Sequence, residues 1–131
     1  MAGDLRPGAD RSVLVVDDEE VVLMLVGDTL RDLGYAVTEA RDGAEALRLS
    51  VGCGPFDLVV SDVGLPGGMN GRQLADVLRV AHPGVPVLFI TGYADNAVLG
   101  AGSLDQGMQV IIKPFALDDL TAKVKAMVEK A

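Results

Sequence analysis

The sequence predicts a single α/β domain with a five-stranded parallel sheet, strand order 2-1-3-4-5, and helices on both faces. Short apolar runs alternate with helical patterns five times along the 131 residues. The runs are rich in Val, Leu and Ile, as in strands that are buried on both faces of a parallel sheet. Polar residues follow these runs at their carboxyl ends, which form the edge where such sheets bind ligands.

The amino-acid composition argues against several classes of function. A net charge of -8 argues against binding a phosphate backbone, so nucleic acid is not an expected partner. Cys53 is the only cysteine, which excludes an internal disulfide and agrees with a reducing compartment. No apolar run approaches the roughly 18 residues that span a bilayer, and the first residues lack the apolar core of a signal peptide. We therefore expect a cytoplasmic protein without a membrane partner.

The first half of the chain is expected to supply three strands and two helices. Residues 1–11 hold Gly, Pro and charge without periodicity and read as a flexible leader, so that the domain covers 12–131. Strands are expected at 12–16, 35–40 and from 58 to the acid at 62. The second helix, over 44–49, can be capped by Asp42. The first, over 19–33, should bury apolar residues spaced by three and four: Val22, Leu25, Val26, Leu30 and Leu33.

The second half should add two strands, at 85–90 and 109–112, and three helices. Asn70 can cap a helix over 71–81 that turns Leu74, Val77 and Leu78 inward. A helix from Asp95 is expected to be short or irregular because of the glycines at 100, 102 and 107. The last helix, from about 117 to 129, should face the sheet with these residues: Leu120, Val124, Met127 and Val128.

The predicted strand order brings the polar strand ends to one edge of the sheet. These residues are Asp17 and Asp18, Asp62, Thr91 and Lys113. Three carboxylates against one ammonium leave a charge of -2, which suits a divalent ion, and an all-oxygen donor set with few carboxylates is typical of Mg²⁺. A hard metal, a carboxylate, a hydroxyl and an ammonium are the components of phosphoryl transfer. Asp62, in the central strand, is the inferred nucleophile.

From residue 12 to about 128 the chain resembles the receiver domain of two-component response regulators, which has a flavodoxin-like fold. The acid pair Asp17 and Asp18, Asp62 followed by GLPGGMNG, Thr91 in FITGY, and the triplet KPF that begins at Lys113 occur in the order and spacing of that family. The resemblance implies phosphorelay signal transduction, with a histidine kinase or phosphotransfer protein as donor and a downstream protein as target. It implies a phosphoacceptor with self-catalysed transfer and slow autodephosphorylation rather than an enzyme.

The resemblance also implies a role for each site residue. Asp62 would accept the phosphoryl group from a phosphohistidine. Asp18 and Asp62 would ligate Mg²⁺ together with the backbone carbonyl of Gly64, and Asp17 would hold a metal-bound water. Of the remaining site residues, Thr91 and Lys113 would contact the phosphoryl oxygens, and the peptide bond between Lys113 and Pro114 is expected to be cis.

The chain departs from the family pattern at Val110, where receivers commonly carry an aromatic switch residue. Tyr93 is a candidate for part of that role, because FITGY partly matches a Phe-x-Thr-Gly-x-Tyr signature of one receiver subgroup. The sequence is equally compatible with a stand-alone regulator and with a receiver of a hybrid kinase. It does not identify the cognate kinase, the output or the oligomeric state.

Three other functions are compatible with the fold class. A haloacid dehalogenase-type phosphohydrolase would place its nucleophile in DxD at the first strand, whereas this chain has adjacent acids there. An FMN carrier needs a phosphate-binding loop after that strand, and DDEE would repel phosphate. A phosphorylation-independent interaction module is disfavoured by the intact Asp62, Thr91 and Lys113. Taken alone, Asp17 with Glu20 reads as a helix capping box.

Overall fold

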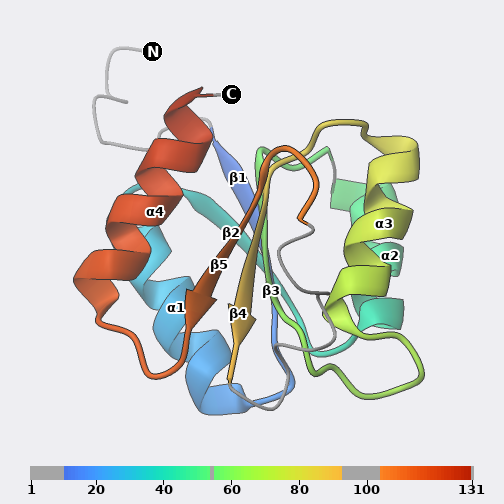
Figure 1. The fold of residues 1–131 in the computed structure, drawn as a ribbon, viewed down its shortest axis with the longest axis horizontal. Coiled ribbons are helices and arrows are strands. Elements are labelled where there is room, and N and C mark those ends of the chain that lie inside the picture. Colours follow the sequence, from blue (N-terminus) through green and yellow to red (C-terminus); the bar gives the residue numbers. More distant parts are fainter. Residues whose placement is uncertain (1–10, 54, 93–103, 131) are drawn as a thin grey trace.

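The structure, a computed structural model, describes residues 11–53, 55–92 and 104–130. It contains a five-stranded parallel sheet in the order β2-β1-β3-β4-β5, as predicted (Figure 1). The strands are β1 Ser12–Val16, β2 Ala36–Ala40, β3 Leu58–Asp62, β4 Val87–Thr91 and β5 Met108–Ile112. The helices are α1 Glu20–Asp32, α2 Gly43–Cys53, α3 Gly71–Ala81 and α4 Leu117–Lys130. The expected leader, apart from Arg11, and the helix expected from Asp95 lie outside the described residues.

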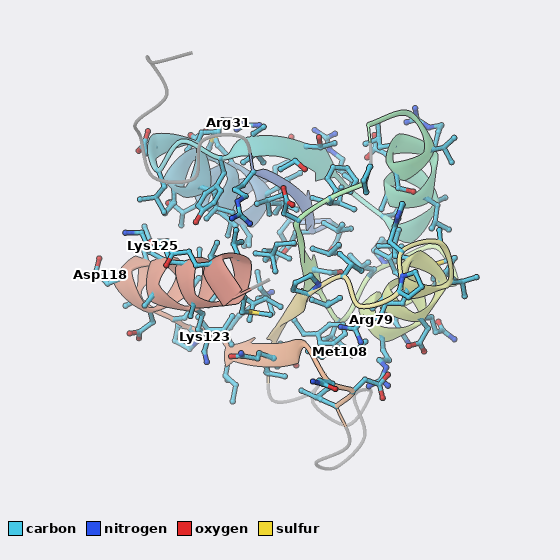
Figure 2. All side chains as sticks on the ribbon, turned by 90° about the horizontal axis from the view of Figure 1, so that it is seen from above. Arg31, Arg79, Met108, Asp118, Lys123 and Lys125 are labelled. Atoms are coloured by element: carbon cyan, nitrogen blue, oxygen red, sulfur yellow. The ribbon has the colours of Figure 1, made fainter. Side chains whose placement is uncertain are left out.

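The helices form one layer on each side of the sheet. Helices α1 and α4 cover one face, and α2 and α3 cover the other (Figures 1 and 2). Successive residues of a strand point to opposite faces, so Val13 and Val15 join the core under α1 and α4, whereas Leu14 and Val16 join the core under α2 and α3. The central strand β3 is buried along its whole length. Its carboxyl end is therefore held rigidly between two apolar layers.

The buried faces of two helices differ from the sequence prediction. In α1, Leu25 is 48% exposed, and Leu23 and Gly27 are buried instead. The buried residues Leu23, Val26, Gly27 and Leu30 form one stripe along α1, and a methyl group built on Gly27 would lie 2.7 Å from the Glu39 carboxylate in β2. Residues two positions apart in a helix are about 200° apart around its axis. Leu25, two positions from both Leu23 and Gly27, therefore points to solvent.

The same helical geometry explains which residues of α3 are buried. Ala75 is buried and Val77 is 44% exposed, although the spacing had suggested that Val77 faces inward. These two residues are again two positions apart, so they lie on opposite sides of the helix. A small residue at the contact lets α3 approach the sheet closely. The larger apolar residue is left on the outside.

The helix caps predicted at Asn70 and Asp42 are present. Asn70 forms a capping box with Gln73: its side chain accepts from the Gln73 N–H at 2.8 Å, and the Gln73 side chain accepts from the Asn70 N–H at 2.9 Å. Asp42 accepts from the Glu45 N–H at 2.8 Å at the start of α2, which extends further than predicted, to Cys53. In the described part of the chain, none of the helices has both the length and the apolar character that crossing a bilayer requires.

Candidate functional site

The backbone positions the candidate site at the carboxyl ends of four strands. Asp62 and Thr91 are the last residues of β3 and β4, and Asp17 and Lys113 directly follow β1 and β5. Strand pairing continues one residue beyond the strands, because the Asp17 N–H donates to Ala40 at 3.1 Å and the Lys113 N–H donates to Thr91 at 2.8 Å. Main-chain hydrogen bonds therefore fix the backbone of site residues that lie far apart in the sequence.

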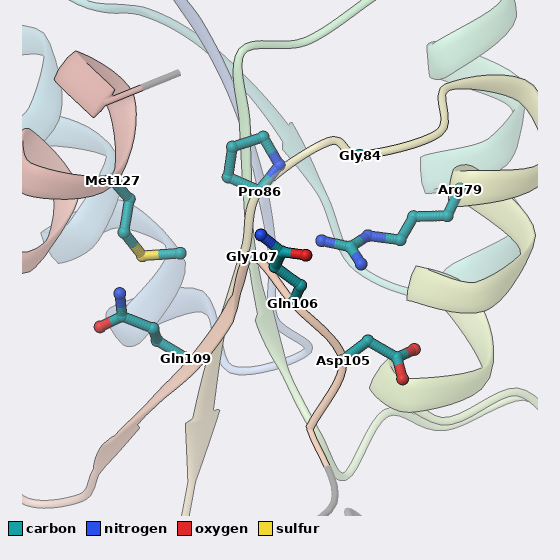
Figure 3. Close-up of a pocket in the computed structure, with 8 residues that line it drawn as sticks. All are labelled: Arg79, Gly84, Pro86, Asp105, Gln106, Gly107, Gln109 and Met127. Carbon is teal, nitrogen blue, oxygen red and sulfur yellow. The ribbon is translucent and has the colours of Figure 1, made fainter.

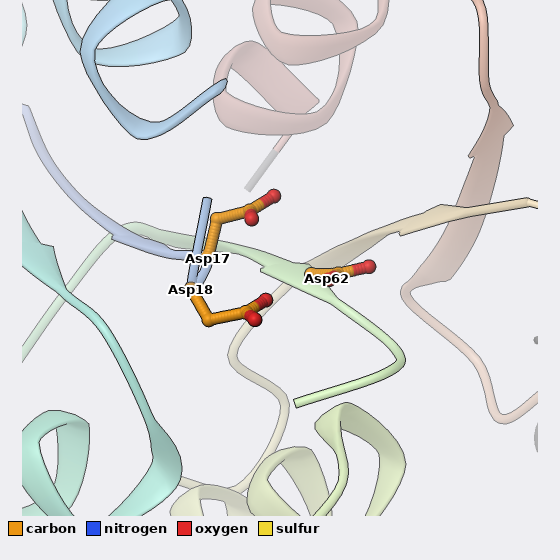
Figure 4. Close-up of side chains that lie close together, drawn as sticks. All are labelled: Asp17, Asp18 and Asp62. Atoms are coloured by element: carbon orange, nitrogen blue, oxygen red, sulfur yellow. The ribbon is translucent and has the colours of Figure 1, made fainter. Parts of the chain in front are cut away.

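Three carboxylates meet at this edge. Each of Asp17, Asp18 and Asp62 offers an oxygen that lies within 4.8 Å of the other two (Figure 4). Asp17 and Asp62 are buried, and Asp18 is exposed. One oxygen of Asp17 accepts the Glu19 N–H at 2.8 Å, whereas its Oδ2 is buried and has no hydrogen-bond partner among the described residues. A buried carboxylate oxygen without a partner calls for a cation, and the donor set fits a hard divalent ion.

Burial raises the pKa of Asp17 to about 6. The hydrogen bond from the Glu19 N–H opposes this shift, and the negative charge of nearby Asp62 adds to it. Taking a carboxylate out of water disfavours its charged form. Without a bound cation, the Asp17 carboxyl therefore keeps its proton to a higher pH than its ordinary pKa would allow.

Lys113 brings a positive charge into the acidic cluster. Its Nζ lies 3.7 Å from Oδ1 of Asp62 and 3.3 Å from Oε1 of Glu19. Burial by itself would lower the pKa of Lys113, but the carboxylates of Asp62, Asp17 and Glu19 outweigh it and raise that pKa. The ammonium therefore stays charged beside these carboxylates.

The structure places Glu19 in contact with Lys113, which the sequence pattern does not indicate. The available signal was the acidic run DDEE, of which only the first two residues were placed in the site. Glu20, the last residue of the run, points elsewhere and forms an ion pair with Arg41 at 2.6 Å. A contact between residues 94 positions apart cannot be read from local spacing.

The remaining predicted residues lie around the acids. Thr91 is fully buried, and its Oγ1 donates to the Gly92 carbonyl at 3.0 Å. Gly64 is exposed in the turn that follows β3. The Lys113–Pro114 peptide bond is cis, as the resemblance implied. Val110 is partly buried against the core beneath α2 and α3, and Tyr93 lies outside the described residues.

A pocket of about 770 Å³ lies near the amino ends of β4 and β5, at the opposite edge of the sheet (Figure 3). Two charged residues that line it are already engaged. Arg79 donates from Nε and Nη2 to the Val85 carbonyl at 3.0 and 2.8 Å, and Asp105 forms an ion pair with Arg72 at 3.2 Å. None of the predicted site residues lines this pocket.

The fold and the acidic edge define a class of protein, and comparison with known families identifies it. Residues 13–125 match the model of the response regulator receiver domain, and the chain belongs to this family. It is thus a receiver domain of two-component phosphorelay signalling.

Relatives with similar sequences include a sensor kinase and transcriptional regulators. The chain is 40% identical over 130 residues to the sensor kinase CckA of Brucella abortus, a match that covers 98% of this chain and 13% of that protein. It is 37% identical over 125 residues to the probable transcriptional regulatory protein TcrX of Mycobacterium tuberculosis, covering 94% of this chain and 52% of that protein. The chain therefore spans at most about half the length of these relatives.

Solved structures agree with this assignment. A response regulator receiver protein from Sinorhizobium medicae superposes with a TM-score of 0.81 at 29% identity, covering 91% of this chain and 94% of the other. The receiver domain of the hybrid histidine kinase CckA gives a TM-score of 0.75 at 32% identity, covering 89% and 98%. The five-stranded receiver fold predicted from the sequence is confirmed.

Proposed function

We propose that this receiver domain accepts a phosphoryl group on Asp62 from a histidine kinase or a phosphotransfer protein, in a reaction that depends on Mg²⁺. The observation that carries the proposal is the position of the Asp62 carboxylate at the end of the central strand. It lies within 4.8 Å of two further acids and 3.7 Å from the Lys113 ammonium. A nucleophile, an acidic donor set and a cation are thereby combined at one point.

The proposed step is a direct transfer between side chains. A carboxylate oxygen of Asp62 attacks the phosphorus of a phosphohistidine, an O–P bond forms, and the P–N bond breaks. The imidazole nitrogen leaves with the electron pair. Phosphoryl transfer requires mainly positioning and charge neutralisation. We assign the charge neutralisation to Lys113 and a positioning contact with the phosphoryl oxygens to the Thr91 hydroxyl. The domain acts in this way as a phosphoacceptor that promotes its own phosphorylation and slow dephosphorylation, rather than as an enzyme.

Asp18, Asp62 and the backbone carbonyl of Gly64 would hold the Mg²⁺, with Asp17 contacting it through water. The fit rests on oxygen donors of the kind that Mg²⁺ prefers and on the buried Oδ2 of Asp17, which lacks a hydrogen-bond partner in the part of the chain that the structure describes. When bound, the ion neutralises charge that develops on the phosphoryl oxygens. It also offsets the mutual repulsion of the three carboxylates.

Phosphorylation is proposed to shift a conformational equilibrium and so control a downstream protein. Thr91 and Lys113 are linked by a backbone hydrogen bond of 2.8 Å, so a movement of either residue toward the phosphoryl group also acts on the β4–β5 pair. Beryllofluoride imitates the phosphoryl group on an aspartate. Hydrogen exchange with and without it should change in Met108–Ile112, and unchanged exchange would place the output elsewhere.

The partners and location follow from this role. The donor is a protein phosphohistidine and the output is a protein contact, both in the cytoplasm. The net charge of -8 is the reason to expect no nucleic acid on this domain itself.

Acetyl phosphate with Mg²⁺ tests the assignment of Asp62. Intact-protein mass spectrometry should show one added phosphoryl group in the wild type and none in Asp62→Asn. The matched control is Asp76→Asn, which changes an exposed acid on α3 and should label normally. Label retained by Asp62→Asn would reject the assignment, and rapid turnover of p-nitrophenyl phosphate would favour a phosphohydrolase.

A further inference from the structure

The main chain of Asp62 is contacted by the side chain that precedes it. Ser61 is 1% exposed, and its hydroxyl donates to the Asp62 carbonyl at 2.9 Å. Ser61 lies two positions from both Val59 and Val63 and therefore points to the same face of the sheet. Both valines belong to the apolar core under α2 and α3. A hydroxyl buried in such a layer needs a hydrogen-bond partner. Here the partner is the carbonyl of the proposed phosphoacceptor.

The first residue of α3 contacts the same carbonyl group. A methyl group built on Gly71 would overlap the Asp62 carbonyl oxygen and would lie 3.0 Å from the Asp62 carbonyl carbon and from the Cα of Val63. The Gly71 N–H also donates to the Val63 carbonyl at 2.8 Å. Gly71 has no positive φ, so the requirement for glycine is one of space.

Two glycines at the ends of α2 do not have this restriction. Among the described residues, nothing lies within 4 Å of a methyl group built on Gly52. On Gly43 it would meet the Met69 side chain, with Sδ at 2.9 Å, and a flexible methionine can move aside. At Gly71 the obstacle is the backbone of a buried central strand, which is closely packed on both sides.

We propose that Ser61 and Gly71 are positioning residues that set the backbone of Asp62, and that α3 must begin with glycine so that the carboxylate keeps its direction. This inference rests on the proposed role of Asp62 as phosphoacceptor. Residues 63 and 71 also close the turn that contains Gly64, so the same contact places the carbonyl proposed for Mg²⁺. Neither positioning residue touches the phosphoryl group.

The first test is Gly71→Ala, with the phosphorylation rate measured over a range of acetyl phosphate concentrations. A displacement of about 1 Å at a reacting group can cost roughly 10²-fold in rate. We expect the maximal rate to fall by about tenfold to a hundredfold while the donor concentration at half-maximal rate stays within about twofold. Circular dichroism at the assay temperature gives the folded fraction by which each rate is corrected. The control is Gly52→Ala, which should react as the wild type does.

The second test is Ser61→Ala, which removes the hydrogen bond with little change in volume. We expect the maximal rate to fall by about fivefold, the equivalent of one ordinary hydrogen bond. Ser61→Thr keeps the hydroxyl and should recover most of the rate. Because both residues act on one carbonyl, Ser61→Ala should cost less in a Gly71→Ala background than alone.

Wild-type rates per folded molecule in both Gly71→Ala and Ser61→Ala would overturn the inference. If Gly71→Ala does not fold, equal rates for Ser61→Ala, Ser61→Thr and the wild type would overturn it.

Mg²⁺ affinity, followed by NMR titration, needs no phosphotransfer. It should weaken in Gly71→Ala but not in Gly52→Ala. Weaker Mg²⁺ binding in Gly71→Ala alone, together with a wild type that acetyl phosphate does not phosphorylate, would reject the proposed function and support the positioning role. Unchanged affinity in Gly71→Ala would count against the positioning role.

Discussion

The ammonium of Lys113 lies closer to Glu19, at 3.3 Å, than to Asp62, at 3.7 Å. Glu19 therefore competes with the proposed phosphoacceptor for the cation of the site. It also adds a negative charge where anionic phosphodonors must approach. The side chain of Glu19 is 61% exposed, so water and salt limit the size of both effects.

Glu19→Gln should accelerate phosphorylation by acetyl phosphate. The substitution releases Lys113 from its ion pair and lowers the repulsion of the anionic phosphodonor, and both effects raise the rate. The free energy of an exposed ion pair corresponds to a rate increase of about twofold to fivefold. The gain should shrink as salt is raised, because the charges are screened. Initial rates at two ionic strengths measure this. Glu20→Gln, which instead breaks the ion pair with Arg41, serves as the control and should have no such effect.

Asp18→Asn should weaken Mg²⁺ binding by at least about tenfold, since even residues outside the coordination shell commonly change metal affinity by that factor. Calorimetric titration of the unphosphorylated domain checks the value. Asp32→Asn makes the same chemical change at an exposed position at the end of α1 and should leave the affinity intact. Equal affinity in Asp18→Asn and the wild type would move the metal away from this carboxylate.

Asp17→Asn should stabilise the metal-free domain at neutral pH. The pKa of Asp17 is raised from 3.8 to about 6, so the folded state binds more protons than the unfolded state between these values. Stability from the neutral carboxyl is present at low pH and is lost as pH rises through about 6. The variant does not undergo this loss, so its advantage should grow by roughly 2 kcal/mol from pH 4 to pH 7.

Urea denaturation of both proteins in EDTA gives this difference directly. Adding Mg²⁺ should reduce it, because a bound cation stabilises the ionised wild type. A difference in the free energy of unfolding that is the same at pH 4 and pH 7 would contradict the role of Asp17 burial.

Lys113→Met should change two properties in opposite directions. Loss of the ammonium removes a competitor for the acids and should tighten Mg²⁺ binding by roughly tenfold. Phosphorylation should nevertheless slow by about 10²-fold or more, because the phosphoryl oxygens lose a preorganised cation. Calorimetry and acetyl phosphate labelling separate the two effects. Lys125→Met, which removes the same charge from α4 (Figure 2), should change neither property.

Local sequence patterns were sufficient for the strand order and for the position of the acids. Apolar runs that end in a polar residue, such as 58–62, specify both a buried strand and the group at its carboxyl end. Parallel pairing then brings those ends together, whatever lies between them. The cis bond before Pro114 was implied by the family resemblance and is present.

Contacts between distant parts of the chain could be decided only by the tertiary structure. Leu23 and Leu25 both fit a three-and-four spacing with other apolar residues of α1, and only packing against the sheet decides that Leu23 is buried and Leu25 exposed. The raised pKa of Asp17 depends on burial by other elements. The Glu19–Lys113 ion pair and the contact of Gly71 with Asp62 likewise depend on how separate elements approach one another in space.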